Sequence, residues 1–233
     1  MTVKVISDKN LENLNKLALE EFKAETKELI KKKGEINIGI PGGSSLDGLF
    51  TELKFATGIQ WEDIKIFLAD ERLVDITHPD SNYRHAHKLF IGTLTEKEII
   101  PEENIHAFFV QEFKNQAKRN YDREIENAFG AYDIILLGVG EDGHVASLFP
   151  NNSALESEEE YTVLINDSPK EPRERISISP KMFEKAKNIM LFFIGENKKN
   201  AYKAFNDKNI TFKECPAKLA LKAEKVTIIT NLK

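Results

Sequence analysis

Residues 132–150 read Tyr132-Asp-Ile-Ile-Leu-Leu-Gly-Val-Gly-Glu-Asp-Gly-His-Val-Ala-Ser-Leu-Phe-Pro150, an apolar run that passes directly into a glycine-rich turn. The run Tyr132 to Leu137 is typical of a strand that is buried in a parallel sheet. In open α/β sheets, the residues that follow the carboxyl end of a strand lie where ligands bind. His144, next to the carboxylate of Asp142, is therefore the leading candidate for proton transfer near neutral pH. The alternative is a histidine that only forms structural hydrogen bonds.

Apolar runs of the same kind recur along the chain, at Glu35–Ile40, Ile64–Leu68, Asn188–Ile194 and Lys225–Thr230. Segments with helical spacing separate them, and the longest, Leu11–Lys33, ends on three lysines and Gly34, which predicts a left-handed helix cap. This alternation predicts an α/β fold of three layers (α/β/α, Rossmann-like), in which helices flank a mostly parallel sheet. Because no stretch resembles a linker and Asn151–Glu160 reads as a surface loop, we expect a single domain over residues 1–233.

The charge balance argues against polyanionic partners. The 33 basic residues are interspersed with 38 acidic ones, the net charge is −5, and we expect no binding to nucleic acid or to a membrane surface. The chain has no apolar run long enough to span a membrane and no leader segment at its N-terminus, which predicts a cytoplasmic protein. No pattern marks an interface between subunits, so the expected state is a monomer.

Cysteine usage limits the possible chemistry. Cys215 is the only cysteine, which excludes an intrachain disulfide and a cysteine metal cluster. It stands before a proline near the C-terminus, and we expect a buried small hydrophobe there, not a nucleophile.

A loop of two glycines and two serines follows the apolar run Glu35–Ile40. Gly42, Gly43, Ser44 and Ser45 precede the apolar pattern of a helix start. Glycines let the backbone approach an anion closely, and free N–H groups at the start of a helix attract negative charge, so a phosphate is the predicted ligand. The alternative is that the serines only cap the helix. A mononucleotide P-loop is excluded because no Gly-Lys-Ser/Thr follows at the required spacing.

Charged residues also follow the run Ile64–Leu68. Asp70 and Arg72, on either side of Glu71, would face a polar substrate in the same crevice as the glycine loop, or they would belong to a solvated loop. His78, which precedes Pro79, could belong to the site or to the surface of the loop.

Two basic residues complete the candidate set. Arg175 starts the segment Arg-Ile-Ser-Ile-Ser, and Lys198 lies just past the run Asn188–Ile194. Both would supply charge-assisted donors to a phosphate, although lysines at such an edge also serve solubility.

The spacing Gly138-x-Gly140-x-x-Gly143 literally matches the dinucleotide-binding fingerprint. That fingerprint belongs to an early strand with a helix directly behind it. Here it lies past the middle of the chain and runs into Phe149-Pro150 and a polar loop, which argues against a nicotinamide cofactor.

Taken together, these motifs resemble the 6-phosphogluconolactonase family over nearly the whole chain. They are Gly42-Gly43-Ser44-Ser45, Asp70-Glu71-Arg72 with His78 and Ser81-Asn82, the turn from Gly138 to Pro150, Arg175-Ile-Ser-Ile-Ser179 and Gly195-Glu-Asn-Lys198. The resemblance implies the fold shared with sugar-phosphate isomerases and deaminases. Ser45, Ser177 and Ser179 stand where the family usually has threonine, and Lys199 where it has a small residue.

The related glucosamine-6-phosphate deaminases look similar in the glycine loop and in the Asp-Gly-His turn. In that family a glutamate stands just before the final proline of the turn and works with the histidine. This chain has Phe149 there, which cannot accept a proton. The resemblance therefore favours the lactonase, while a non-catalytic sugar-phosphate sensor would be free to lose His144 or Arg72, and the chain retains both.

The lactonase resemblance implies hydrolysis of 6-phospho-D-glucono-1,5-lactone without a metal or an organic cofactor. His144 would activate water, Arg72 would stabilise the developing oxyanion, and Asp70 and Asp142 would orient the sugar, the water or the imidazole. The phosphate would lie on the loop from Gly42 to Ser45, with Arg175 and Lys198 as counter-charges.

Overall fold

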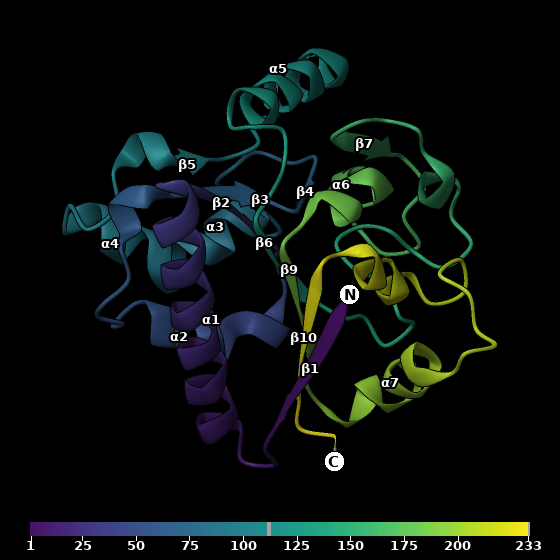
Figure 1. Ribbon diagram of the computed structural model, residues 1–233. Helices are drawn as coiled ribbons and strands as arrows, with labels where there is room; N and C mark the ends of the chain where they lie inside the picture. The colour runs from purple at the N-terminus through teal and green to yellow at the C-terminus, as the bar shows by residue number, and fades with distance from the viewer. Residues whose placement is uncertain (111–112, 233) are drawn as a thin grey trace.

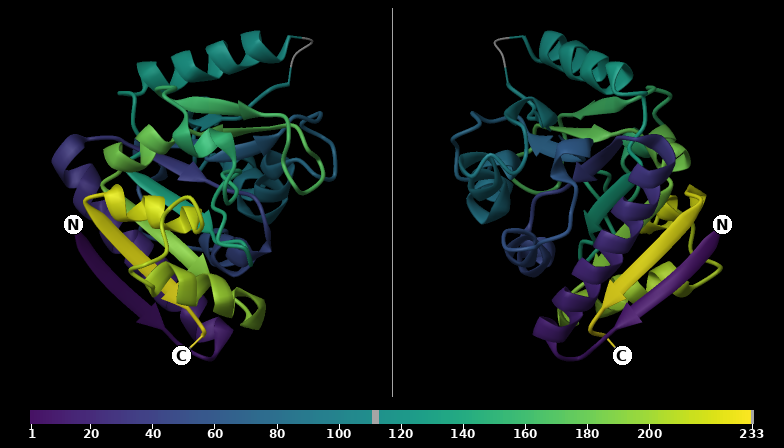
Figure 2. Two further views of the ribbon diagram at one scale, coloured as in Figure 1. Left: turned by 90° about the vertical axis from the view of Figure 1, so that its right-hand side faces the viewer. Right: turned by 60° about the vertical axis from the view of Figure 1, so that its left-hand side comes forward.

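A computed structural model describes residues 1–110 and 113–232. Within these residues, parallel strands form a seven-stranded sheet in the order β1-β10-β9-β6-β2-β3-β5. Its strands are β1 (Thr2–Ser7), β2 (Ile36–Ile40), β3 (Ile64–Leu68), β5 (Ile105–His106), β6 (Ile134–Gly138), β9 (Asn188–Phe193) and β10 (Lys225–Thr230). Figure 2 shows β1 and β10 side by side at one edge of the sheet.

Helices cover both faces of this sheet (Figure 1). One apolar cluster contains side chains of α1 (Leu11–Lys33), α2 (Asp47–Leu53), α3 (Asn82–Ala86), the π-helical turn η3 (His87–Ile91) and α4 (Gly92–Glu96). The other contains side chains of α5 (Lys114–Asn127), α6 (Pro180–Lys185), α7 (Lys199–Asn206) and the 3₁₀ helix η7 (Pro216–Lys222). The predicted three-layer α/β architecture is confirmed.

A small antiparallel sheet stands beside the carboxyl end of β3. In the described part of the chain it has three strands in the order β4-β8-β7, namely β4 (Asp70–Arg72), β8 (Arg175–Ile178) and β7 (Thr162–Ile165). The register places Arg72 opposite Arg175 and Asp70 opposite Ser177. Two arginines that are far apart in sequence are thereby neighbours.

The five predicted strands are present, with ends that differ by at most two residues from the predicted ones. Helix α1 has its predicted bounds, and Gly34 ends it with φ +87° and an N–H that donates to the carbonyl oxygen of Ile30 at 2.8 Å. Cys215 is buried, as expected. The predicted surface loop Asn151–Glu160 differs in part, because it contains the 3₁₀ turn η5 (Ser153–Glu156) with two buried apolar side chains.

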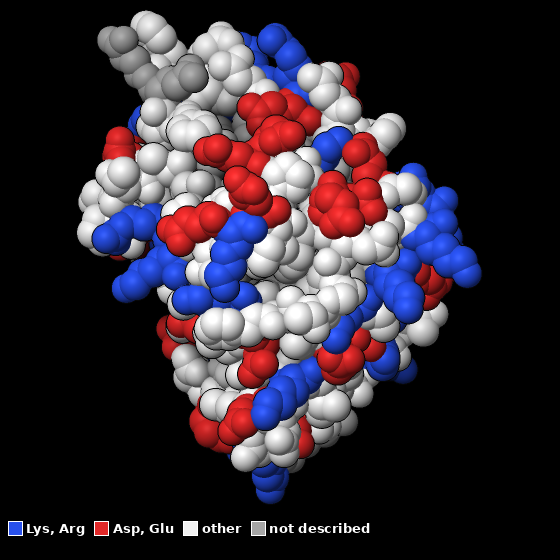
Figure 3. Space-filling model, turned by 90° about the vertical axis from the view of Figure 1, so that its left-hand side faces the viewer, with Lys and Arg blue, Asp and Glu red and all other residues white. Residues whose placement is uncertain are grey.

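Acidic and basic side chains alternate on the face shown in Figure 3. On α1 they form pairs one turn apart, such as Lys16 with Glu12 and Lys32 with Glu28, each at 2.6 Å. Such exposed pairs contribute little to stability, because solvent screens the two charges. Among the described residues, no helix has the length and the apolar content required to cross a bilayer.

Candidate active site

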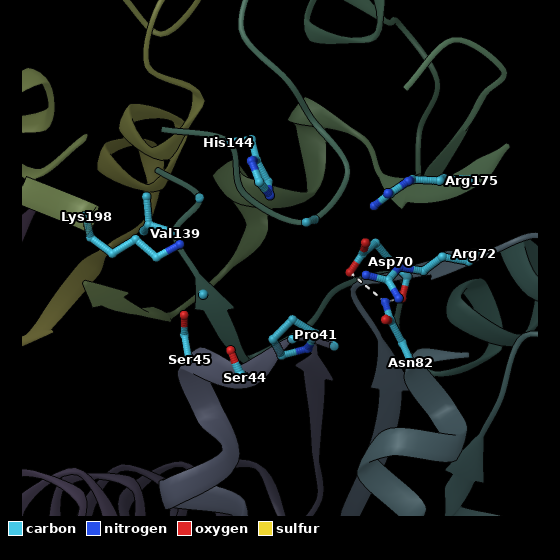
Figure 4. Close-up of a pocket in the computed structure, with 15 residues that line it drawn as sticks. Pro41, Ser44, Ser45, Asp70, Arg72, Asn82, Val139, His144, Arg175 and Lys198 are labelled. Carbon is cyan, nitrogen blue, oxygen red and sulfur yellow. Dashed lines mark hydrogen bonds between the residues drawn. The ribbon is translucent and has the colours of Figure 1, made fainter. Parts of the chain in front are cut away.

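A pocket lies at the carboxyl ends of four adjacent strands, β9, β6, β2 and β3. From β2 the chain proceeds outward to β3 and β5, and it then returns to β6 on the other side of β2. This reversal of direction is where open α/β sheets bind ligands. The pocket is lined by Pro41, Gly42, Gly43, Ser44, Ser45, Asp70, Arg72, Asn82, Gly138, Val139, Gly140, His144, Ala146, Arg175 and Lys198 (Figure 4).

The predicted site residues therefore surround one cavity, apart from Asp142. Asp142 is not part of the pocket lining, but its carboxylate contacts Nδ1 of His144. His78 is not part of this lining and contacts Asp80 in its own loop.

The glycine loop after β2 is held in a tight conformation. Gly43 has φ +89° and stands directly before the short 3₁₀ helix η1 (Ser44–Leu46). Gly42 lies against the side chain of Asn82, so that a Cβ atom at position 42 would be only 1.9 Å from Oδ1 of that asparagine. The glycine at position 42 is thus required by close packing, and the one at position 43 by its backbone conformation.

This packing leads to a prediction on stability. We expect Gly42→Ala to lower the free energy of unfolding by about 1–3 kcal/mol, because the added methyl group overlaps a buried side chain. Urea titration of the purified variant measures this loss. Gly58→Ala is the comparison without overlap, because a methyl group there has no atom within 4 Å and any loss of stability comes from the positive φ of +78° alone. A Gly42→Ala protein as stable as the wild type would show that the loop is not tightly packed.

Strand β4 sends its side chains to opposite sides. Asp70 and Arg72 face the pocket, whereas Glu71 accepts hydrogen bonds from the backbone N–H groups of Asn82 (2.7 Å) and Tyr83 (2.9 Å) and from the hydroxyl of Ser81 (3.0 Å). Burial raises the pKa of Glu71, although these N–H donors oppose the shift. The middle residue of the Asp-Glu-Arg triplet thus anchors the start of α3.

The Asp70 carboxylate is held by neutral donors. Its Oδ1 accepts from Nδ2 of Asn82 at 3.2 Å, and its Oδ2 accepts from the hydroxyl of Ser147 at 2.7 Å. Arg72 lies next to it and donates from Nη1 to the backbone oxygen of Asp80 at 2.6 Å.

His144 is oriented by the carboxylate two residues before it. Its Nδ1 lies 2.5 Å from Oδ1 of Asp142, which assigns the proton of the neutral imidazole to Nδ1 and leaves Nε2 as the basic nitrogen. Partial burial would raise the pKa of Asp142, but the hydrogen bond and the charge of His144 lower it to about 2. The carboxylate is therefore ionised throughout the neutral range. The His144 ring packs on Phe149, with ring centroids 4.5 Å apart.

The cations of the pocket lie on two sides. Figure 4 shows Lys198 on the side of Ser45, with Arg175 across the pocket near Asp70 and Arg72. Burial lowers the pKa of Lys198, and the charge of Lys170 adds to this shift.

Arg175 is fixed by the main chain. Its Nε donates to the carbonyl oxygen of Pro172 at 2.9 Å, and its Nη2 donates to that of Lys170 at 3.1 Å. Its guanidinium also lies over the ring of Phe149, 5.5 Å from the centroid. Burial lowers the pKa of Arg175, as does the charge of Arg72, while Asp70 opposes the shift.

Comparison with known proteins identifies the family. The family model of glucosamine-6-phosphate isomerases and 6-phosphogluconolactonases matches residues 9–229. The chain belongs to this family.

Within the family, the chain is similar to 6-phosphogluconolactonases. It is 35% identical over 205 residues to the 6-phosphogluconolactonase of Borreliella burgdorferi, a match that covers 88% of the chain and 87% of the relative. It is 34% identical to the probable 6-phosphogluconolactonase 1 of Arabidopsis thaliana, over 82% of the chain and 76% of the relative. The chain is thus an enzyme of the 6-phosphogluconolactonase type.

The fold is also that of this family. The crystal structure of 6-phosphogluconolactonase from Thermotoga maritima superimposes with a TM-score of 0.84 at 22% identity, covering 99% of both chains. This likeness supports the architecture of layers and strands described above.

Compared with the residues expected for a 6-phosphogluconolactonase, the structure adds Asn82 and Ser147. In the sequence, Asn82 belongs to the Ser81-Asn82 motif and Ser147 to the turn that carries His144. Both side chains are buried, with 1% and 0% of their surface exposed. Neither residue could be predicted to contact Asp70 from the sequence, because their burial depends on the packing of β4 against the His144 turn in the folded chain.

Proposed function

We propose that this enzyme hydrolyses 6-phospho-D-glucono-1,5-lactone to 6-phospho-D-gluconate, the second step of the oxidative pentose phosphate pathway. The observation that carries the proposal is the Asp142–His144 pair, whose imidazole borders a pocket with cationic groups on two sides. A lactone carbonyl is already electrophilic. Its hydrolysis therefore requires a base for water, positive charge for the oxyanion and a means of holding the phosphate.

In the proposed mechanism, His144 is the general base. Its Nε2 takes a proton from water while the water oxygen bonds to C1 of the lactone, and the carbonyl electrons move to the oxygen. The tetrahedral intermediate then expels the ring oxygen by breaking its bond to C1. The imidazolium returns the proton to that oxygen, which becomes the 5-hydroxyl group. The ionised Asp142 stabilises the imidazolium between the two proton transfers.

The cations have different proposed roles. Arg72 stabilises the negative charge that develops on the carbonyl oxygen. The Gly42–Ser45 loop and Lys198 hold the phosphate on the other side of the pocket. Arg175 was expected to share the phosphate with Lys198, but its position near Asp70 and Arg72 favours a role at the reacting end.

The side chain at position 149 favours the lactonase over a deaminase. Phe149 is buried and packs against His144, where deaminases carry a glutamate. A phenyl ring offers the imidazole a packing surface and no proton acceptor.

The decisive assay follows acid release from freshly generated 6-phosphogluconolactone above the spontaneous rate, with glucosamine 6-phosphate as the second substrate. Acceleration of lactone hydrolysis alone is the expected result. Release of ammonia from glucosamine 6-phosphate with no effect on the lactone would identify a deaminase. No turnover of either substrate would favour a sugar-phosphate sensor.

Lys198 provides a test of the phosphate site. We expect Lys198→Ala to weaken binding of 6-phosphogluconate by about 10-fold or more, because it removes a charge-assisted donor worth about 1.5–3 kcal/mol. Isothermal titration calorimetry measures the dissociation constant. The neighbouring Lys199 is exposed and does not line the pocket, so Lys199→Ala is the matched control with unchanged binding. Equal affinities in both variants would remove Lys198 from the phosphate site.

A further inference from the structure

Ser147 joins three segments that carry charged groups of the site. It lies three residues after His144 on the same turn, and its hydroxyl donates to Oδ2 of Asp70 on β4 at 2.7 Å. The same hydroxyl oxygen lies 3.5 Å from Nη1 of Arg175 on β8. The backbone N–H of Ser147 donates to Oγ of Ser177, also on β8, at 3.3 Å.

The serine is completely enclosed. None of its surface is exposed, and it is not among the residues that line the pocket, so it has no access to a bound substrate. Its hydroxyl nevertheless accepts a hydrogen bond from Arg175 and donates one to Asp70. A buried carboxylate and a buried guanidinium are thereby connected by one neutral group.

Asn82 completes the support of the carboxylate. Its Nδ2 donates to Oδ1 and to the backbone oxygen of Asp70, at 3.2 and 2.8 Å. Each oxygen of the Asp70 carboxylate thus has its own neutral donor, one from the start of α3 and one from the His144 turn. The carboxylate cannot rotate without losing one of them.

We propose that Ser147 is a positioning residue that sets the orientation of Asp70 and Arg175 relative to His144. This inference rests on the proposed lactonase function. The hydroxyl fixes the distance between the turn that carries the base and the two strands that carry the charged groups at the reacting end. Loss of the hydroxyl leaves the Asp70 carboxylate with the Asn82 side chain as its neutral donor, so that Asp70 can adopt orientations that do not match the transition state. Arg175 loses its contact with Ser147 but keeps its bonds to the main chain, and the phosphate end stays intact.

A double-mutant cycle with Asp70 tests the proposal. We expect Ser147→Ala to lower kcat by about 10-fold in the wild-type background, the usual worth of a hydrogen bond to a charged group. In the Asp70→Ala background the same change should cost less than about twofold, because Ser147 acts through Asp70. The dissociation constant of inorganic phosphate should stay unchanged in all variants. A purely structural role would instead give independent, additive losses.

Two further variants complete the design. Ser147→Cys preserves the size of the side chain with a much weaker donor, and it should show the same loss of kcat if the alanine variant does not fold. Ser179→Ala is the matched control, because this serine is also completely buried, its hydroxyl donates to the backbone oxygen of Glu160 and it does not line the pocket. Its kcat should stay within about twofold of the wild type.

The outcomes separate this inference from the function on which it rests. Lactone hydrolysis by the wild type with additive losses in the cycle, or full activity of both Ser147 variants, would overturn the role of Ser147 alone. A wild-type protein without lactonase activity would overturn the proposed function and the inference with it.

Discussion

His144→Ala is expected to lower kcat for lactone hydrolysis by about 10² to 10⁴, the usual contribution of a general base. The pair with Asp142 is the reason for this expectation. The carboxylate, with its pKa lowered to about 2, fixes the proton on Nδ1 and leaves the other nitrogen to accept the proton of water. Because the proposed phosphate site lies at another part of the pocket, the affinity for 6-phosphogluconate should change little.

Stopped-flow measurement of acid release and calorimetric titration of 6-phosphogluconate check both halves of this prediction. His78→Ala is the matched control, since this histidine lies outside the pocket lining and its Nδ1 accepts a hydrogen bond from the backbone N–H of Asp80 in its own loop. A His144→Ala protein with wild-type turnover would show that His144 is not the general base. A variant that lost phosphate binding as well would point to collapse of the turn.

Arg72→Ala is expected to lower kcat by about 10² to 10³, comparable to the removal of one donor from an oxyanion hole. The guanidinium is partly held by the Asp80 carbonyl oxygen and lies next to Asp70, at the end of the pocket where we propose that the lactone carbonyl binds. Arg72→Lys should recover only part of the loss, because a lysine retains the charge but lacks the planar fork of donors.

The same acid-release assay serves for these variants, and Arg84→Ala is the control because Arg84 lies on α3 outside the pocket lining. If Arg72→Ala raised KM and left kcat unchanged, the arginine would bind ground state and transition state equally. Its proposed role at the oxyanion would then be wrong.

The central sheet was predictable from the sequence because its inner strands are buried on both faces. Such strands, like β6 and β9, appear as uninterrupted apolar runs. Strand β1 lacks that signal because it lies at the sheet edge, where Val3 and Val5 remain 44% and 42% exposed. The small second sheet was missed for a related reason, since β4 consists of three charged residues and β8 begins with an arginine.

That several of the predicted residues line one pocket could be expected from the sequence, but the pairing between them could not. Gly42, His144 and Lys198 each follow a strand of the parallel sheet, and the carboxyl ends of such strands meet at one edge. Arg175 belongs to the antiparallel sheet, so its place near Asp70 depends on the register of β4 with β8. The sequence contains no local signal for that register.

The alternation of side chains in β4 has a consequence for variation in chain length. Asp70 and Arg72 face the cavity and Glu71 faces α3, and this arrangement depends on a spacing of two residues. An insertion or deletion of one residue within the triplet would exchange these orientations, withdrawing a charge from the reacting end and leaving the α3 backbone N–H groups without their acceptor. Among related enzymes, gaps in this segment should therefore be rarer than amino-acid replacements.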